Sequence, residues 1–131
     1  MEVFIMENIQ FIRIGFDFDL MTFSSDIIEL NGGQGNELKF YQNSIDCRTI
    51  DIVNLSKDVC IIIDDEGLLK SGNPVFEVKT EMIDEPLQLA GTMLFAGQTE
   101  TDEGAEIDTL STGKCLELLN NLKIRVIGVT K

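Results

Sequence analysis

Short segments with the apolar periodicity of β-strands recur along this chain, and turn residues separate them. Ile12, Ile14 and Phe16 alternate with polar or small residues, which is the two-residue period of a strand with one buried face. Residues 59–63 are instead a continuous apolar run, which is typical of a central strand buried on both faces. This run ends at the sequence DDEG, residues 64–67, which is typical of a turn.

Two segments have the features of helices. Residues 37–45 follow Asn36, a suitable N-cap, and Leu38, Tyr41 and Ile45 would share one face. Residues 111–122 begin with Ser111, which we expect to be an N-cap. In this second helix an apolar stripe is expected, made of Leu116, Leu119 and Leu122.

The remaining segments fit strands and loops. Residues 22–30 fit either a strand or a short helix, residues 98–108 are an acidic loop, and Gly91 is a bulge inside a strand. Further strands are expected at residues 48–53, 75–79, 89–96 and 123–129. Because helices and strands do not alternate strictly, the sequence predicts an α+β fold. We expect one domain over residues 1–131, with two helices and a mostly antiparallel sheet of about six strands. Residues 1–35 form its strand-rich N-terminal segment.

Charge restricts the partners of this protein. The chain has 23 acidic and 10 basic residues, which give a formal net charge of -13 at pH 7. Such a charge opposes direct binding of nucleic acid or of an anionic membrane, and it favours a basic protein partner. No apolar stretch reaches the ~18 residues of a membrane span, and Met1 and Glu2 do not begin a signal peptide. We therefore expect a cytoplasmic protein.

The chain contains no histidine, which excludes the most common catalytic bases and zinc ligands. Its three cysteines, Cys47, Cys60 and Cys115, form no CxxC pair and read as reduced, buried thiols. The sequence STGK at residues 111–114 is no phosphate-binding loop, because Asp108 stands where that motif requires glycine. We expect no cofactor and no bound metal.

Acidic side chains gather in three stretches of the chain, at residues 64–66, 81–85 and 100–108. Nine acidic residues and only one basic residue, Lys79, lie within residues 77–108. Carboxylates spaced like phosphates can occupy a basic channel built for DNA, in which one charge recurs per ~1.7 Å of duplex. The alternative is a set of solvated turns. The candidate partner-binding residues are Asp64, Asp65, Glu66, Asp84, Glu85, Glu100, Asp102, Glu103 and Glu106.

A second hypothesis is a Mg²⁺-dependent nuclease. Asp65 precedes the triplet Glu77-Val78-Lys79, and such a D…ExK pattern can hold Mg²⁺ and activate water. A cross-strand ion pair on an exposed face explains Glu77 and Lys79 equally well.

A third hypothesis is a structural or regulatory accessory protein. Five of the eight phenylalanines lie within the first 23 residues: Phe4, Phe11, Phe16, Phe18 and Phe23. They form either part of the core or an exposed edge through which a homodimer assembles.

Three motifs resemble a family of small uncharacterised proteins carried by phages, plasmids and conjugative elements of bacteria. They are DDEGLLK at residues 64–70, GTMLFAG at residues 91–97, and the helix start at residues 109–111. The resemblance covers residues 36–122, and SGNP at residues 71–74 departs from the family's order. It implies a protein encoded by a mobile element, and together with the net charge of -13 it favours an inhibitor of a bacterial defence effector of the CRISPR or restriction type. The expected partner is a basic, nucleic-acid-binding protein.

Overall fold

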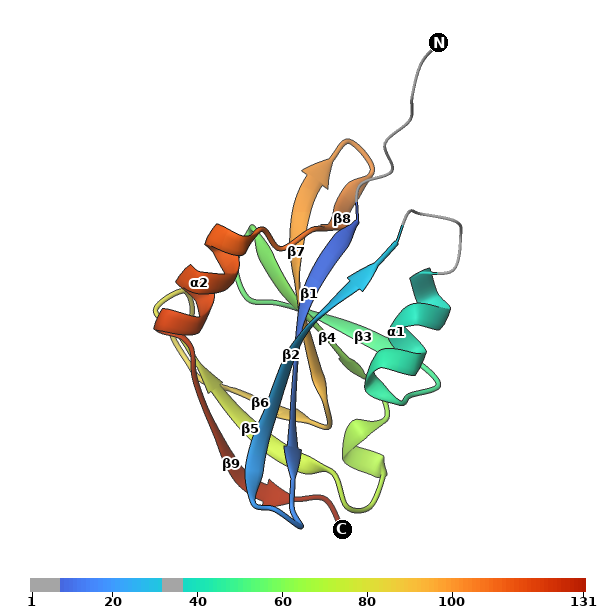
Figure 1. Cartoon of the computed structure of the whole chain (residues 1–131), viewed down its shortest axis with the longest axis vertical. Coiled ribbons are helices and arrows are strands. Elements are labelled where there is room, and N and C mark those ends of the chain that lie inside the picture. The colour runs from blue at the N-terminus through green and yellow to red at the C-terminus, as the bar shows by residue number, and fades with distance from the viewer. Residues whose placement is uncertain (1–7, 32–36) are drawn as a thin grey trace.

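The computed structural model describes residues 8–31 and 37–131, which form two β-sheets and two α-helices (Figure 1). The expected Asn36 cap and Phe4 lie outside the described residues. The strands are β1 (Ile9–Asp17), β2 (Thr22–Leu30), β3 (Ile50–Asn54), β4 (Val59–Asp64), β5 (Pro74–Lys79), β6 (Leu87–Ala90), β7 (Met93–Thr101), β8 (Gly104–Asp108) and β9 (Lys123–Val129). The helices are α1 (Glu37–Ile45), the 3₁₀ turn η1 (Gly67–Leu69) and α2 (Thr112–Asn121).

All strand pairs in the described residues are antiparallel. Sheet A has the order β2-β1-β7-β4-β3. Strand β8 pairs with the C-terminal half of β7, so the sheet has six strands. Sheet B has the order β6-β5-β9. The expected antiparallel α+β class is confirmed, and residues 22–30 are a strand. The separate three-stranded sheet is a feature that the sequence did not predict.

The main core lies between the two sheets. Ile61 of β4 and Phe95 of β7 face Phe76 and Val78 of β5, and none of these four side chains is exposed to solvent. Cys115 and Leu118 of α2 join the same cluster and close one end of it. As predicted, the run at residues 59–63 is a central strand, because β4 pairs with both β3 and β7.

A second cluster covers the outer face of sheet A. Tyr41 and Ile45 of α1 pack on Phe11, Ile62 and Leu94, so β4 and β7 are buried on both faces. The fold thus has three layers, with α1 on sheet A and sheet A on sheet B (Figure 1).

The expected single strand at residues 89–96 is two strands in different sheets. Gly91 has a φ of +92°, which side-chain-bearing residues rarely adopt, and its N–H donates to the Pro74 carbonyl at 2.9 Å. The chain therefore turns sharply at Gly91 and passes from β6 in sheet B to β7 in sheet A. Likewise, the expected acidic loop at residues 98–108 is the β7–β8 hairpin.

The buried faces of both helices differ in part from the expected ones. Leu116 and Leu119 are 59% and 48% exposed, and Cys115 and Leu118 are buried in their place. In α1 Leu38 is exposed, whereas Tyr41 and Ile45 are buried as expected. No helix in the described ranges is long and apolar enough to cross a membrane.

Candidate functional site

The β7–β8 hairpin presents acidic side chains on a projecting two-stranded ribbon. Residues 99–101 of β7 pair only with β8, so this ribbon extends beyond the rest of sheet A (Figure 1). Glu100 lies opposite Ala105, and Glu106 lies opposite Thr99. Because neighbouring residues of a strand point to opposite faces, Glu100 and Glu106 occupy the two faces of the ribbon. Asp102 and Glu103 form its tip.

Local hydrogen bonds explain why the chain turns at this tip. Thr101 Oγ1 donates to the Gly104 carbonyl at 2.8 Å and accepts from the Glu103 N–H at 3.3 Å. Thr99 Oγ1 donates to Asp108 Oδ2 at 2.7 Å. The threonines therefore hold the backbone, and the hairpin carboxylates other than Asp108 do not take part.

The hairpin carboxylates are exposed to solvent. Within residues 8–31 and 37–131, no ion pair or side-chain hydrogen bond involves the carboxylates of Glu100, Asp102, Glu103 or Glu106. A concentration of unpaired negative charge is what a basic surface attracts at long range. With four members, the hairpin is the largest of the groups of predicted partner-binding residues.

The acidic cluster that follows β4 is largely engaged within the protein. Asp64 is only 6% exposed, pairs with Lys70 Nζ at 2.6 Å and accepts the Glu66 N–H at 2.9 Å. This ion pair raises the pKa of Lys70. Arg48 binds the carboxylate of Glu66 at 2.8 Å. Of the three acids in this cluster, only Asp65 is exposed.

The third acidic cluster lies elsewhere again. Asp84 and Glu85 are exposed in the loop between β5 and β6, beside α2. In Figure 1 this loop, the β7–β8 hairpin and the turn η1 lie at three separate places on the molecule. The predicted partner-binding residues therefore form three patches, and Glu100, Asp102, Glu103 and Glu106 are one of them.

The residues of the nuclease hypothesis do not converge. Glu77 on β5 accepts from Arg125 Nε on β9 at 2.8 Å, and this hydrogen bond lowers the pKa of Glu77. The cross-strand ion pair that the sequence offered as the alternative explanation is therefore present for Glu77, whereas Lys79 lies opposite Lys123. Asp65 follows β4 of the other sheet. The part of the chain that the structure describes contains no group of three or more His, Cys, Asp or Glu side chains suited to a metal ion.

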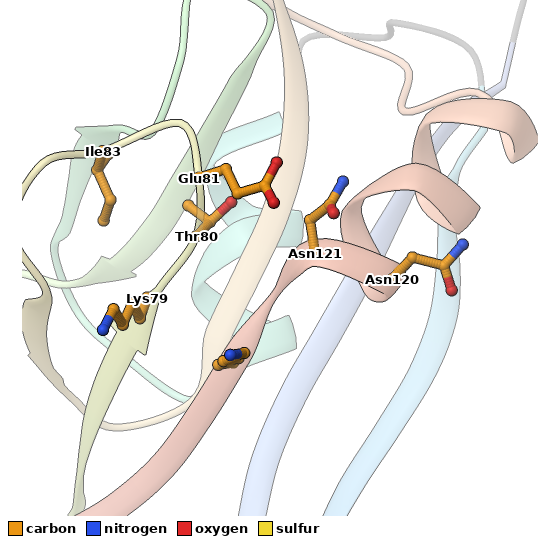
Figure 2. Close-up of a pocket in the computed structure, with 7 residues that line it drawn as sticks. Lys79, Thr80, Glu81, Ile83, Asn120 and Asn121 are labelled. Atoms are coloured by element: carbon orange, nitrogen blue, oxygen red, sulfur yellow. The ribbon is translucent and has the colours of Figure 1, made fainter.

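The loop between β5 and β6 forms a hollow with the end of α2, shown in Figure 2. Its volume is about 330 Å³, and it is lined by Lys79, Thr80, Glu81, Ile83, Asn120, Asn121 and Lys123. Lys79 and Lys123 lie directly opposite each other on β5 and β9. Such a like-charge pair is unfavourable, and Glu81 offsets part of its charge. The lining thus contains both positively and negatively charged side chains, and this mixture indicates no single class of ligand.

The cysteines are placed as structural residues. Cys60 and Cys115 are buried, Cys47 is partly buried, and all three are free thiols. Burial raises the pKa of Cys60 to about 11, so this side chain is a neutral thiol at pH 7. None of the three has the exposed, electropositive surroundings of a reactive cysteine.

The turn η1 also carries two exposed leucines, which no sequence pattern predicted. Leu68 and Leu69 of η1 are 71% and 82% exposed. The Asp64–Lys70 pair and the Asn73 side chain, which donates to the Gly67 carbonyl at 2.9 Å, hold this turn. The signal in the sequence is the position of the two leucines between Gly67 and Lys70, inside a polar turn.

These observations define an acidic antiparallel α+β domain whose most prominent surface feature is a charged β-hairpin. Residues 22–120 match a family described as a domain of unknown function, DUF3846, and the chain belongs to this family. The match begins at β2, so the resemblance starts earlier than the expected residue 36 and takes in part of the N-terminal segment. No curated protein and no solved structure matches the chain.

Proposed function

We propose that this protein is a non-catalytic inhibitor encoded by a phage or another mobile element. It acts in the host cytoplasm by occupying the nucleic-acid groove of a bacterial defence effector of the CRISPR or restriction type. The observation that supports this proposal is the β7–β8 hairpin, with its four exposed and unpaired carboxylates, Glu100, Asp102, Glu103 and Glu106.

The hairpin presents its carboxylates on several sides. Alternate residues of a strand recur every ~6.7 Å, so Glu106 and Asp108 lie about that far apart on one face of the ribbon. Carboxylates lie on both faces and at the tip of the ribbon. A basic channel that surrounds a nucleic acid would contact all three sides.

The overall charge supports the same partner. A net charge of -13 repels nucleic acid itself and steers the protein toward a basic surface. The nuclease alternative lacks comparable support, because Glu77 is bound by Arg125 and lies in a different sheet from the strand that leads to Asp65.

The test compares two variants of equal net charge. The first reverses the hairpin acids: Glu100→Lys, Asp102→Lys, Glu103→Lys and Glu106→Lys. The second reverses four exposed acids elsewhere: Asp65→Lys, Glu81→Lys, Asp84→Lys and Glu85→Lys. Each tagged protein is used to capture effectors from cells with an active defence system, at low and high salt and with or without duplex DNA.

The proposal predicts capture of a DNA-binding effector that high salt and added DNA both displace. The hairpin variant should lose this effector and its inhibition, whereas the second variant should retain both. Equal loss with both variants would assign binding to net charge alone. Unchanged inhibition by the hairpin variant would refute the proposal.

A further inference from the structure

Strand β2 is an open edge of sheet A. Within the described residues it pairs only with β1, over the nine positions from Thr22 to Leu30. Its side chains are exposed from Thr22 to Ile27. An open edge presents unpaired backbone N–H and C=O groups, which can pair with another strand.

Most of the usual protections of an open edge are missing from β2, whose two charged residues are Asp26 and Glu29. The strand contains no proline and no lysine, and it has no register shift against β1. Its Asp26 is bound by Arg13 Nε at 3.0 Å and therefore is not a free charge on the edge. This edge is long and regular, and it can accept a partner strand.

Two apolar side chains of β2 continue the inner face of sheet A into solvent. Phe23 lies opposite Phe16, and Ile27 lies opposite Ile12, whose side chain belongs to the main core. Phe23 and Ile27 are nevertheless 48% and 57% exposed. The Phe23 ring is fixed by an edge-to-face contact with Phe16 at 5.1 Å between centroids. An ordered apolar side chain at an open edge is suited to a cross-strand contact.

The order of residues in β2 is self-complementary about Ser25. If two copies pair antiparallel with Ser25 opposite Ser25, Phe23 of each copy lies opposite Ile27 of the other. The same register places Ser24 opposite Asp26, and it sets no two like charges against each other. Moving the centre by one residue to Asp26 would instead place Asp26 opposite Asp26 and Phe23 opposite Glu29.

We propose that this protein forms a homodimer in which the β2 strands of two copies pair antiparallel about a two-fold axis at Ser25. The two copies of sheet A then form one continuous sheet, and two Phe23–Ile27 contacts cover the exposed apolar strip. This symmetric arrangement closes on itself, so it gives dimers rather than fibres. The proposal does not depend on the role of the hairpin.

The charge of the chain sets the salt dependence of this dimer. Each copy carries a net charge of -13, so the copies repel each other at low salt. Added salt screens this repulsion and leaves the apolar contact, so dimerisation should strengthen. Capture of a basic effector has the opposite salt dependence, which separates the two interactions.

The first experiment is a disulfide test of the register. Directly opposed residues of antiparallel strands have Cα atoms about 4.5–5.5 Å apart, a separation that a disulfide can bridge. A Ser25→Cys variant should therefore give a reducible covalent dimer under mild oxidation. The matched control is Ser24→Cys, whose opposed residue is Asp26, and it should cross-link no more than the unmodified protein.

The second experiment measures the oligomeric state by sedimentation velocity. Ile27→Lys should raise the dissociation constant of the dimer by about tenfold or more, because the contact is lost twice. The control is Ile52→Lys on β3, the opposite edge, where Ile52 is 45% exposed and a folded protein is equally expected. Its dissociation constant should not change.

Three results would overturn the proposal. The unmodified protein could remain a monomer at its highest soluble concentration in moderate salt. Ser24→Cys could cross-link as well as Ser25→Cys. Finally, Ile52→Lys could dissociate the dimer while Ile27→Lys does not, which would move the interface to β3.

Discussion

Asp64 at the end of β4 and Lys70, which follows η1, form an ion pair, with Lys70 Nζ at 2.6 Å from Asp64 Oδ2. The aspartate is buried, whereas the lysine is 41% exposed. The two residues begin and end the motif DDEGLLK, one of the motifs that carry the family resemblance. Asp64 and Lys70 therefore stabilise the turn η1, in which Leu68 and Leu69 are exposed to solvent.

Removing the lysine should destabilise the protein. Lys70→Met leaves the buried carboxylate of Asp64 without its cation, and we expect the free energy of unfolding to fall by about 1–2 kcal/mol. This is less than for a fully buried pair, because solvent screens Lys70 in part. Urea denaturation measures the change. The control Asp65→Asn alters an exposed neighbour and should stay within about 0.5 kcal/mol; equal effects would contradict the assignment.

Gly67 should not tolerate a side chain. A Cβ at this position would lie 2.5 Å from the Ala90 carbonyl oxygen, where η1 packs on β6. Gly67→Ala should cost about 1–3 kcal/mol of stability by forcing the backbone apart. Gly113→Ala is the matched control, because a Cβ there meets nothing within 4 Å. It should be neutral or slightly stabilising. A thermal melt of each variant gives the comparison, and an unchanged midpoint for Gly67→Ala would be the contrary result.

Alkaline pH should weaken the α1 layer. Burial raises the pKa of Tyr41 to about 12 from its ordinary 10.0, so the folded state keeps a proton that the unfolded state releases. This contribution to stability is complete below pH 10 and is lost as the pH rises toward 12. The loss from this one group is about 2–3 kcal/mol.

Denaturation at successive pH values checks this prediction. The Tyr41→Phe variant removes the titrating group and should flatten the decline above pH 10, while Cys60, with a pKa of about 11, still contributes in both proteins. Identical slopes for the two proteins would show that Tyr41 does not titrate as its burial requires.

The N-terminus of α2 should depend on its cap. Ser111 Oγ accepts the Lys114 N–H at 3.2 Å, as the sequence predicted. Ser111→Ala should cost about 0.5–2 kcal/mol, whereas Ser111→Asp supplies another capping oxygen and should recover most of the loss. Chemical denaturation of both variants tests the cap. A Ser111→Asp variant as unstable as Ser111→Ala would mean that capping is not what Ser111 contributes.

Helix α2 illustrates how far sequence patterns reach. Its start at Ser111 was predictable, because an N-cap acts within one turn of the chain. Its buried face was not, because Leu116 and Leu119 are as apolar as Leu118 and only the position of the two sheets selects among them. Cys115 and Leu118 face the core, whereas Leu116 and Leu119 face solvent.

The candidate site shows the same division. The acidic residues were found directly from composition, but their grouping was not. Gln98 to Asp108 lacks apolar alternation, so it read as a loop, and β8 exists because Gly97 to Thr101 supplies its partner strand. Asp64 and Glu66 read as surface acids, and only the positions of Lys70 and Arg48 show that both are engaged.

The sequence by itself determined the antiparallel α+β class, the central strand β4, both helices and the strong negative charge. These properties follow from local periodicity, capping and composition, which act between residues close in the chain. The tertiary structure decided that Gly91 divides one apolar segment between two sheets, which acids pair, and that β2 ends as an open edge. Those outcomes depend on contacts between distant segments, since a strand's partner and a side chain's burial are set by what packs against them.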